Sequence, residues 1–346
     1  MQQFTYVRAD EAAAAVTAIE RAGHATSGTH GMQPGQYLAG GTNIIDYMKL
    51  GVMRPTELVD INGLESAYGR ITAGPQGLRL GALARMSQVE AHPEVRRDYP
   101  VLAQSLQLAA SAQLRNMASL GGNVLQRTRC SYFRDTSYPA CNKRSPGSGC
   151  SALDGVNRQH GLFGTSERCI ATYPGDFAQA LVALGATVEL LGRAGARVIR
   201  FEDLHLPYGV SPHIETTLKP GELITGFFVP AAAWTRRSLY LKIRDRRSYA
   251  FALTSAAVAL DLGQKREVRE ARIGLGGVAS KPWRAHAAEA SLRDKRLNEA
   301  AARNAAEIAF ADARPQAHNA FKVELGKRTL VRALLSAAAM EVQDHG

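Results

Sequence analysis

The residues of this sequence best suited to bind a metal or a redox centre are its four cysteines. They are Cys130, Cys141, Cys150 and Cys169, with the spacing C-x10-C-x8-C-x18-C, and the 346 residues contain no other cysteine. The surrounding segment, residues 120–170, is rich in Gly, Pro, Ser and charged residues, and no helical or strand period runs through it. A long loop inside a compact domain is usually either disordered or functional. Four cysteines gathered in it favour a functional insert.

Four thiols can form disulfides, hold a zinc ion or ligate an iron–sulfur cluster. Disulfides are rare in reducing compartments, and the N-terminal residues M-Q-Q-F-T-Y-V-R show no secretory leader. Structural zinc usually takes a close C-x2-4-C pair, which this sequence lacks. Four widely spaced cysteines on an irregular loop can reach a [4Fe-4S] cluster, and seven basic against three acidic residues between 127 and 168 suit its negative charge. The residues favour the cluster and leave the other two readings open.

Length and composition restrict the class of protein. A chain of 346 residues with 45% hydrophobic residues can bury cores in two or three domains. The net charge of +11 suits an anionic cofactor or an acidic protein partner. The basic residues are dispersed and form no nucleic-acid module, so no nucleic-acid partner is expected. No run approaches 18 apolar residues, so no membrane span is expected.

Two paired-glycine motifs lie about 80 residues apart. The first, L-A-G-G-T-N-I-I at residues 38–45, predicts a short strand, a tight turn and a helix that Thr42 or Asn43 can cap. Such a turn exposes backbone N–H groups to a phosphate, although it is neither the dinucleotide fingerprint nor a Walker loop. The second, R-N-M-A-S-L-G-G-N at residues 115–123, repeats the apolar approach, the paired glycines and the Asn as a second turn. Together the turns predict a grip on the two ends of one diphosphate-containing cofactor.

Hydrophobic periodicity and helix stop signals give the remaining elements. Helices are predicted at residues 10–22, 44–50, 87–91, 101–110, 177–184, 285–293, 298–311 and 318–339. Strands are predicted at residues 37–39, 56–61, 78–86, 187–191, 197–201, 219–230, 255–262 and 270–275. The strand that ends at Pro230 marks a predicted domain boundary.

These motifs carry a resemblance to a known family. L-A-G-G-T-N, S-L-G-G-N and Y-P-G-D resemble motifs of the FAD-binding subunits of the xanthine dehydrogenase and aldehyde oxidoreductase family of molybdenum hydroxylases. Q-R-T-R-C, C-N-K-R-x-P-G-S-G-C and C-I-A-T resemble the branch of periplasmic aldehyde oxidoreductases with an extra [4Fe-4S] cluster, and the β subunit of 4-hydroxybenzoyl-CoA reductase has a comparable insert. The resemblance covers nearly the whole chain.

The resemblance implies an α+β fold in three parts. Residues 1–64 and 65–230 would form the two subdomains of an FAD-binding fold of the vanillyl-alcohol-oxidase type, with the iron–sulfur insert at about 125–169. Residues 231–346 would form a C-terminal domain of antiparallel sheet and helices.

The same resemblance assigns cofactor-binding residues. The FAD pyrophosphate would be wrapped by the backbone of Leu38, Ala39, Gly40, Gly41, Thr42, Asn43, Ile44 and Ile45. Also placed along FAD would be Arg115, Ser119, Gly122, Asn123, Ile170, Asp176 and Lys242, with Asp176 on FAD hydroxyls and Lys242 near the flavin. The four cysteines would ligate the cluster. From the residues alone, Asp176 is equally a helix N-cap, and Lys242 stands in a charge run typical of a solvated edge strand.

The sequence shows no nucleophile–base pair and no metal-hydrolase motif, so substrate chemistry is expected in another chain. With FAD exchanging two electrons and a cubane exchanging one, the resemblance implies an electron-transfer subunit of an aldehyde oxidoreductase. A molybdenum-cofactor subunit and a [2Fe-2S] subunit would complete a heterotrimer, and an external acceptor would take the electrons. The cluster would be either a relay or a structural staple.

Alternative functions are a free-standing FAD-dependent oxidoreductase of the same fold and a zinc-stapled binding module without flavin. The resemblance implies a periplasmic location by co-export with a partner that bears the signal. A cytoplasmic location is the alternative.

Overall fold

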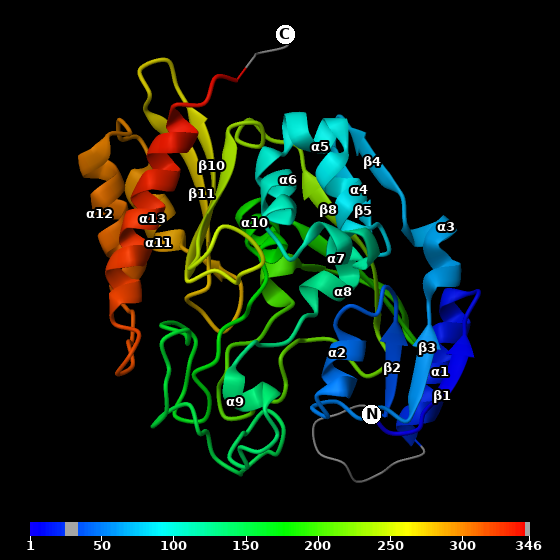
Figure 1. Ribbon diagram of the computed structural model, residues 1–346. Helices are drawn as coiled ribbons and strands as arrows, with labels where there is room; N and C mark the ends of the chain where they lie inside the picture. Colours follow the sequence, from blue (N-terminus) through cyan, green and yellow to red (C-terminus); the bar gives the residue numbers. More distant parts are fainter. Residues whose placement is uncertain (25–33, 343–346) are drawn as a thin grey trace.

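The computed structural model describes residues 1–24 and 34–342, and within these residues the chain forms three sheets with helices packed on them (Figure 1). The strand orders are β1-β3-β2, β4-β5-β8-β6-β7 and β12-β11-β10-β9. No helix in the described part of the chain is long and apolar enough to cross a membrane. The mixture of helices and sheets confirms the predicted α+β class.

The first sheet is parallel and carries the first glycine motif at its edge. Its elements are β1 (Thr5–Arg8), α1 (Ala12–His24), β2 (Gly35–Leu38), α2 (Ile44–Lys49) and β3 (Glu57–Asp60). Val16 and Ile19 of α1 pack on Val59 of the central strand β3 and bury one face of the sheet. The carboxyl ends of parallel strands meet at one edge, so the turn after β2 lies beside the end of β3, where Asn62 Nδ2 donates to Ala39 O at 3.1 Å.

The second sheet is antiparallel and carries most of the helices that precede the C-terminal domain. Its elements are η1 (Asn62–Leu64), α3 (Glu65–Tyr68), β4 (Ile71–Gly74), β5 (Gly77–Gly81), α4 (Met86–Ala91), α5 (Pro93–Asp98), α6 (Pro100–Gln107), α7 (Ala112–Met117), α8 (Leu120–Val124), α10 (Phe177–Ala183), β6 (Thr187–Gly192), β7 (Gly195–Arg200), η2 (Phe201–Asp203) and β8 (Leu223–Pro230). Leu80 of β5, Leu102 of α6, Phe177 of α10 and Phe227 of β8 are fully buried in one core. This core fixes the helices that carry the second glycine motif.

The cysteine segment runs between α8 and α10 with little regular structure, as its composition predicts (Figure 1). It contains one short helix, α9 (Ser131–Arg134), and isolated bridges pair Cys141 with Cys150 and Ser166 with Cys169. A parallel bridge between Phe163 and Ala279 attaches the insert to the C-terminal domain. This bridge therefore ties the insert to a residue of the following domain more than 100 positions later in the chain.

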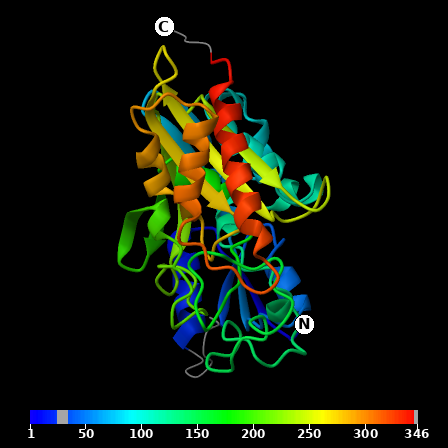
Figure 2. The same ribbon diagram turned by 90° about the vertical axis from the view of Figure 1, so that its left-hand side faces the viewer.

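The C-terminal domain is a sheet with one layer of helices over it, which Figure 2 shows from the helix side. Its elements are β9 (Ser238–Ile243), β10 (Thr254–Leu262), β11 (Val268–Gly276), β12 (Trp283–Arg284), α11 (His286–Leu292), α12 (Glu299–Phe310) and α13 (Phe321–Ala338). Leu260 and Ile273 of the sheet share a buried core with Leu330 and Leu334 of α13.

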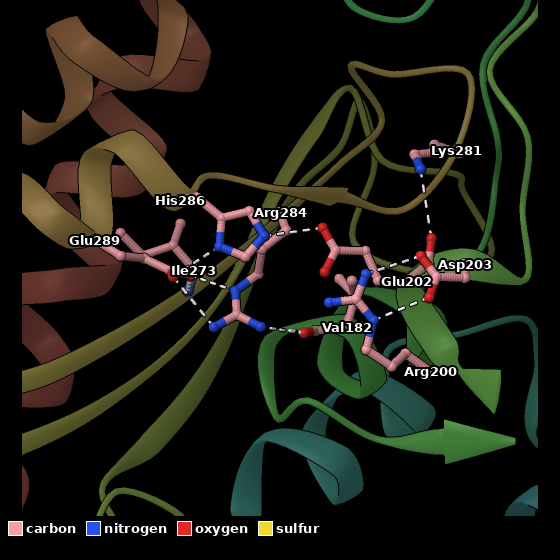
Figure 3. Close-up of polar contacts among 9 residues, drawn as sticks. All are labelled: Val182, Arg200, Glu202, Asp203, Ile273, Lys281, Arg284, His286 and Glu289. Atoms are coloured by element: carbon pink, nitrogen blue, oxygen red, sulfur yellow. Dashed lines mark hydrogen bonds and ion pairs between the residues drawn. The ribbon is translucent and has the colours of Figure 1, made fainter. Parts of the chain in front are cut away.

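A polar network attaches this domain to the preceding part of the chain (Figure 3). Arg284 of β12 pairs with Glu289 of α11 and donates from Nη1 to Val182 O of α10 at 2.9 Å. On the outer side, His286 Nε2 lies 2.9 Å from Glu202 Oε1 of η2. The guanidinium is 5% exposed, so its bonds fix α10 against the C-terminal sheet with little competition from water.

Two predictions of local structure were wrong, and one helix was missed. The strand predicted at residues 78–86 ends at Gly81. The prediction ran too far because Ala82, Ala84 and Met86 stay buried after the chain has left the sheet. The second paired-glycine turn is the helix α8, which its N-cap Ser119 stabilises. The helix α5 was not predicted, although Pro93 at its first position is a helix start signal.

Candidate functional site

The first glycine turn joins β2 to α2 and presses against the second motif. Gly41 has φ +74°, and a Cβ on Gly40 would lie 1.8 Å from Met117 O of α7. Only glycine allows this approach. Asn43 stands at the N-cap of α2, but its side chain makes no capping bond, contrary to the prediction. Its Nδ2 instead donates to Gly122 O at 3.1 Å.

The second motif forms the capped helix α8. Ser119 Oγ accepts from Gly122 N at 3.2 Å, and the Gly122 carbonyl accepts from Asn43 of the first turn. Asn123 Oδ1 is buried and has no hydrogen-bond partner among the described residues. Arg115 forms an ion pair with Glu90 and donates from Nη1 to a backbone carbonyl. The structure thus brings the two predicted turns together and leaves one buried acceptor of the second turn unpaired.

Asp176 and Lys242, predicted on the FAD, lie against each other. Lys242 Nζ is 2.8 Å from Asp176 Oδ2, and Tyr240 OH donates to Asp176 Oδ1 at 2.7 Å. Burial raises the pKa of Asp176 above its ordinary value, while the charge of Lys242 opposes the rise. Asp176 stands at the N-cap of α10, as the sequence predicted, although its side chain makes no capping bond. The Lys242 side chain is 1% exposed, so the solvated-strand interpretation was wrong. The ion pair satisfies both buried charges.

The four cysteines, all unpaired, line one small cavity of about 10 Å³. Cys130 precedes α9, Cys141 and Cys150 face each other across an antiparallel bridge, and Cys169 closes the insert. Ile170, predicted near the flavin, is fully buried beside Tyr132, in an apolar group that Cys130 and Cys150 contact. The fold therefore assembles the predicted ligand set from three separate stretches of the insert.

Burial keeps two thiols of this cavity protonated at neutral pH. Burial raises the pKa of Cys130 and of Cys169 to about 12. Backbone N–H groups oppose this rise, those of Phe133 and Tyr132 at Cys130 and that of Ala171 at Cys169. Such thiols ionise only when a positive centre replaces their protons. In the described ranges, no group of three or more His, Cys, Asp or Glu is placed to hold a metal ion.

Two arginines of the insert reach back to the first glycine turn. Arg134 binds Asp46 of α2 through Nη1 and Nη2 at 2.8 and 3.1 Å, and Arg129 Nη1 lies 3.2 Å from the same carboxylate. Burial alone would raise the pKa of Asp46, but Arg134 and Arg129 lower it below its ordinary value. Arg129 also donates to Asn43 Oδ1 at 2.9 Å. Asn43 and Asp46 thus connect the cysteine insert to both glycine motifs.

A second anchor joins the insert to the segment before β8. Glu215 Oε1 accepts from Lys143 Nζ at 2.9 Å and from Arg127 Nε and Nη2 at 3.0 and 2.9 Å. Burial alone would raise the pKa of Glu215, but Arg127 and Lys143 lower it to about 2. The basic residues of the insert, predicted to offset a cluster's charge, are thus largely paired with carboxylates from elsewhere in the chain.

A histidine that the sequence analysis did not single out contacts one of the cysteines. His160 Nε2 is 3.2 Å from Cys130 Sγ, and burial lowers the pKa of His160 to about 4, so its ring is neutral at pH 7. Lys322 of α13 donates to the His160 carbonyl at 2.9 Å, and burial lowers the pKa of Lys322 to about 7. His160 lies between Cys150 and Cys169 but belongs to no ligand motif, and Lys322 lies 162 residues later in the chain, so only the fold reveals these contacts.

Comparisons with known proteins agree with this geometry. Residues 2–232 match the FAD binding domain in molybdopterin dehydrogenase, and residues 239–337 match the CO dehydrogenase flavoprotein C-terminal domain. The chain is 46% identical over 342 residues to the aldehyde oxidoreductase FAD-binding subunit of Escherichia coli (strain K12), covering 98% of this chain and 99% of that protein. It is 27% identical to the glyceraldehyde dehydrogenase medium chain of Sulfolobus acidocaldarius, covering 86% and 83% of the two chains.

Solved structures share the fold. Reconstituted CO dehydrogenase from Oligotropha carboxidovorans aligns with a TM-score of 0.75 at 23% identity, covering 98% of this chain and 99% of that chain. Quinoline 2-oxidoreductase from Pseudomonas putida 86 aligns with a TM-score of 0.72 at 21% identity, covering 97% of both chains. The predicted FAD-binding fold with a C-terminal sheet domain is confirmed. The chain belongs to the FAD-binding subunits of the molybdopterin-dependent dehydrogenases and is an oxidoreductase subunit of the molybdenum hydroxylase family.

Proposed function

We propose that this chain is the FAD- and [4Fe-4S]-bearing subunit of a molybdenum-dependent aldehyde oxidoreductase. It passes electrons from a molybdenum-cofactor subunit and a [2Fe-2S] subunit to an external acceptor. The observation that carries the proposal is the gathering of four separated thiols around one cavity within an FAD-binding chain. The similarity to an aldehyde oxidoreductase subunit along 98% of this chain supports an aldehyde as the substrate class.

The two glycine motifs fit FAD. The turn within residues 38–45 packs so close to α7 that only glycine fits at position 40. Exposed N–H groups of such a turn can bind a pyrophosphate. The buried Asn123 Oδ1, unpaired in the described part of the chain, is an acceptor available to a hydroxyl or N–H group of the cofactor. Arg115, Asp176 and Lys242 already have protein partners, so a contact with FAD requires them to share or exchange those bonds.

The cysteine cavity fits a cluster better than a zinc ion or disulfides. A zinc ion requires four sulfurs at about 2.3 Å from one centre, whereas a cubane accepts each sulfur on a different iron. The thiols line a cavity and do not converge on one ion position. Cys130, Cys141, Cys150 and Cys169 would therefore hold the cluster, and backbone N–H groups already face the first and last of these sulfurs.

The chain's own residues keep the two sites in one rigid arrangement. When bound, FAD supplies two-electron chemistry and a [4Fe-4S] cluster supplies one-electron chemistry. Asn43, in the first glycine motif, donates to Gly122 O of the second motif and accepts from Arg129 of the insert. Asp46 adds two ion pairs to the insert. These contacts fix the spacing between the cavity and the glycine turns, on which electron transfer between them would depend.

Anaerobic purification of the chain tests both cofactors. We expect the visible absorption of an oxidised flavin, about four irons per chain and no zinc. The Cys141→Ser variant should lose iron, while the matched control Ser137→Ala, exposed in the same insert, should retain it. Zinc in place of iron would contradict the cluster, and full aldehyde turnover by the chain alone would contradict the electron-transfer role in favour of a free-standing oxidoreductase.

The cysteine variant also separates a relay from a staple. In the complete heterotrimer, loss of iron with FAD retained and slower flavin reduction by aldehyde would indicate a relay. Loss of FAD together with iron would indicate a structural staple. Asp46 and Glu215 join the insert to other parts of the chain, so a collapsed insert would disturb them. The flavin content of the variant distinguishes the two outcomes.

We further propose that the subunit works in the periplasm after co-export with a partner that bears the signal. The resemblance of the cysteine insert to the periplasmic aldehyde oxidoreductases supports this location. Cell fractionation of a strain with all subunits should place the chain in the periplasm, and deletion of the partner's signal should retain it in the cytoplasm. Recovery in the cytoplasm with all signals intact would contradict the proposal.

A further inference from the structure

Among the described residues, His160 is the one whose side chain lies within hydrogen-bond distance of a cysteine sulfur. Its Nε2 lies 3.2 Å from Cys130 Sγ. The residue is 5% exposed, and its Nδ1 has no hydrogen-bond partner among the described residues. A neutral imidazole carries one N–H. The proton therefore belongs on Nε2, where the sulfur is an acceptor as soon as it carries negative charge.

The fold holds this ring in place from the C-terminal domain. Asn319 Nδ2 donates to the His160 carbonyl at 3.2 Å, and Lys322 Nζ donates to the same carbonyl at 2.9 Å. Asn157 Oδ1, on the turn before His160, accepts from His318 N at 2.9 Å. Asn319 and Lys322 are both fully buried. A segment about 160 residues later in the chain thus fixes the backbone that presents the imidazole to the cysteine.

The buried position of Lys322 has a consequence for charge. Its Nζ donates to two backbone carbonyls, of His160 and Gly277, and within the described residues no carboxylate pairs with it. A buried ammonium without a carboxylate is costly unless an anion lies near. An anionic centre on the far side of His160 would supply that charge through the low-dielectric interior.

We propose that His160 Nε2–H donates a hydrogen bond to the Cys130 sulfur of the cluster and raises the cluster's reduction potential, with Lys322 and Asn319 as the residues that position His160. The inference rests on the proposed function, because it requires the cluster. Hydrogen bonds to ligand sulfurs are one of the levers by which a protein sets the potential of an iron–sulfur centre. A donor stabilises the reduced cluster more than the oxidised one, because the reduced cluster carries one more negative charge.

The test is a potentiometric titration of the complete enzyme followed by electron paramagnetic resonance of the cluster. In His160→Leu, the ratio of reduced to oxidised cluster at a fixed potential should fall about tenfold, equal to about 59 mV for a one-electron couple. Lys322→Met should shift the potential in the same direction by less. The matched control is His205→Leu: His205 is also buried, but its Nε2 contacts Val124 O, so the cluster potential should not move.

Pulsed electron paramagnetic resonance of wild-type enzyme labelled with ¹⁵N-histidine gives a measurement that needs no folded variant. A histidine nitrogen coupled to the reduced cluster is expected, and it should persist in His205→Leu. An unchanged potential in His160→Leu with iron retained, or no histidine coupling in the wild type, would overturn this inference while leaving the cluster in place. Absence of iron from the wild-type chain would instead overturn the proposed function, and this inference with it.

Discussion

Glu215 offers a quantitative test of how the insert is held. Its carboxylate is 19% exposed and is shared by Lys143, 1% exposed, and Arg127, 13% exposed. The difference between the ordinary pKa of 4.5 and the folded pKa of about 2 corresponds to about 3 kcal/mol of stability. Breaking a buried ion pair by removing one partner costs about 3 to 5 kcal/mol, which agrees. We therefore expect Glu215→Gln to lower the free energy of unfolding by about 3 kcal/mol at pH 7.

The pH dependence has a definite sign. Because the folded pKa of Glu215 lies below its unfolded value, the stabilisation is complete above pH 4.5 and is lost as the pH falls toward 2. The gap between wild type and Glu215→Gln should therefore be constant from pH 7 to 5 and smaller by about 1 kcal/mol at pH 3.5.

The assay is urea unfolding of the full chain, followed by circular dichroism and flavin fluorescence. Glu299→Gln is the matched control, because Glu299 pairs with Arg303 in α12 with both side chains more than 60% exposed. Surface pairs of this kind contribute about 0.5 kcal/mol or less. A loss below about 1 kcal/mol in Glu215→Gln, or a gap that does not shrink at low pH, would refute the assigned ion-pair cluster.

Three further predictions test other contacts. Asp176→Asn should destabilise the chain by about 3 kcal/mol because it leaves Lys242 buried without a counter-charge; urea unfolding of the double variant with Lys242→Met should recover part of this loss, and no recovery would argue against the pairing. Gly40→Ala should lose FAD, because its Cβ would lie 1.8 Å from a backbone carbonyl of α7, whereas Gly74→Ala, with nothing within 4 Å, should keep it; equal flavin content in both would contradict the packing. Asp46→Asn should speed proteolysis within residues 125–169 by releasing two arginines, and an unchanged cleavage rate would show that this link is dispensable.

The sequence by itself determined the features that are local in the chain. Paired glycines predicted the turn between β2 and α2, and the four cysteines of one segment predicted a common site for four thiols, because backbone conformation and donor type depend on few neighbouring residues. The turn predicted around residues 119–123 was wrong, because Ser119 caps a short helix there.

Only the tertiary structure decided which charges and rings meet. Asp176 lies 66 residues from Lys242, and His160 is held by a helix 162 residues later, so no period or spacing relates them. The basic residues of the insert looked like free cations because their carboxylate partners, Asp46 and Glu215, come from elsewhere in the chain. Burial is the physical reason: a charge withdrawn from water must find a partner, and the fold, not the neighbouring sequence, supplies it.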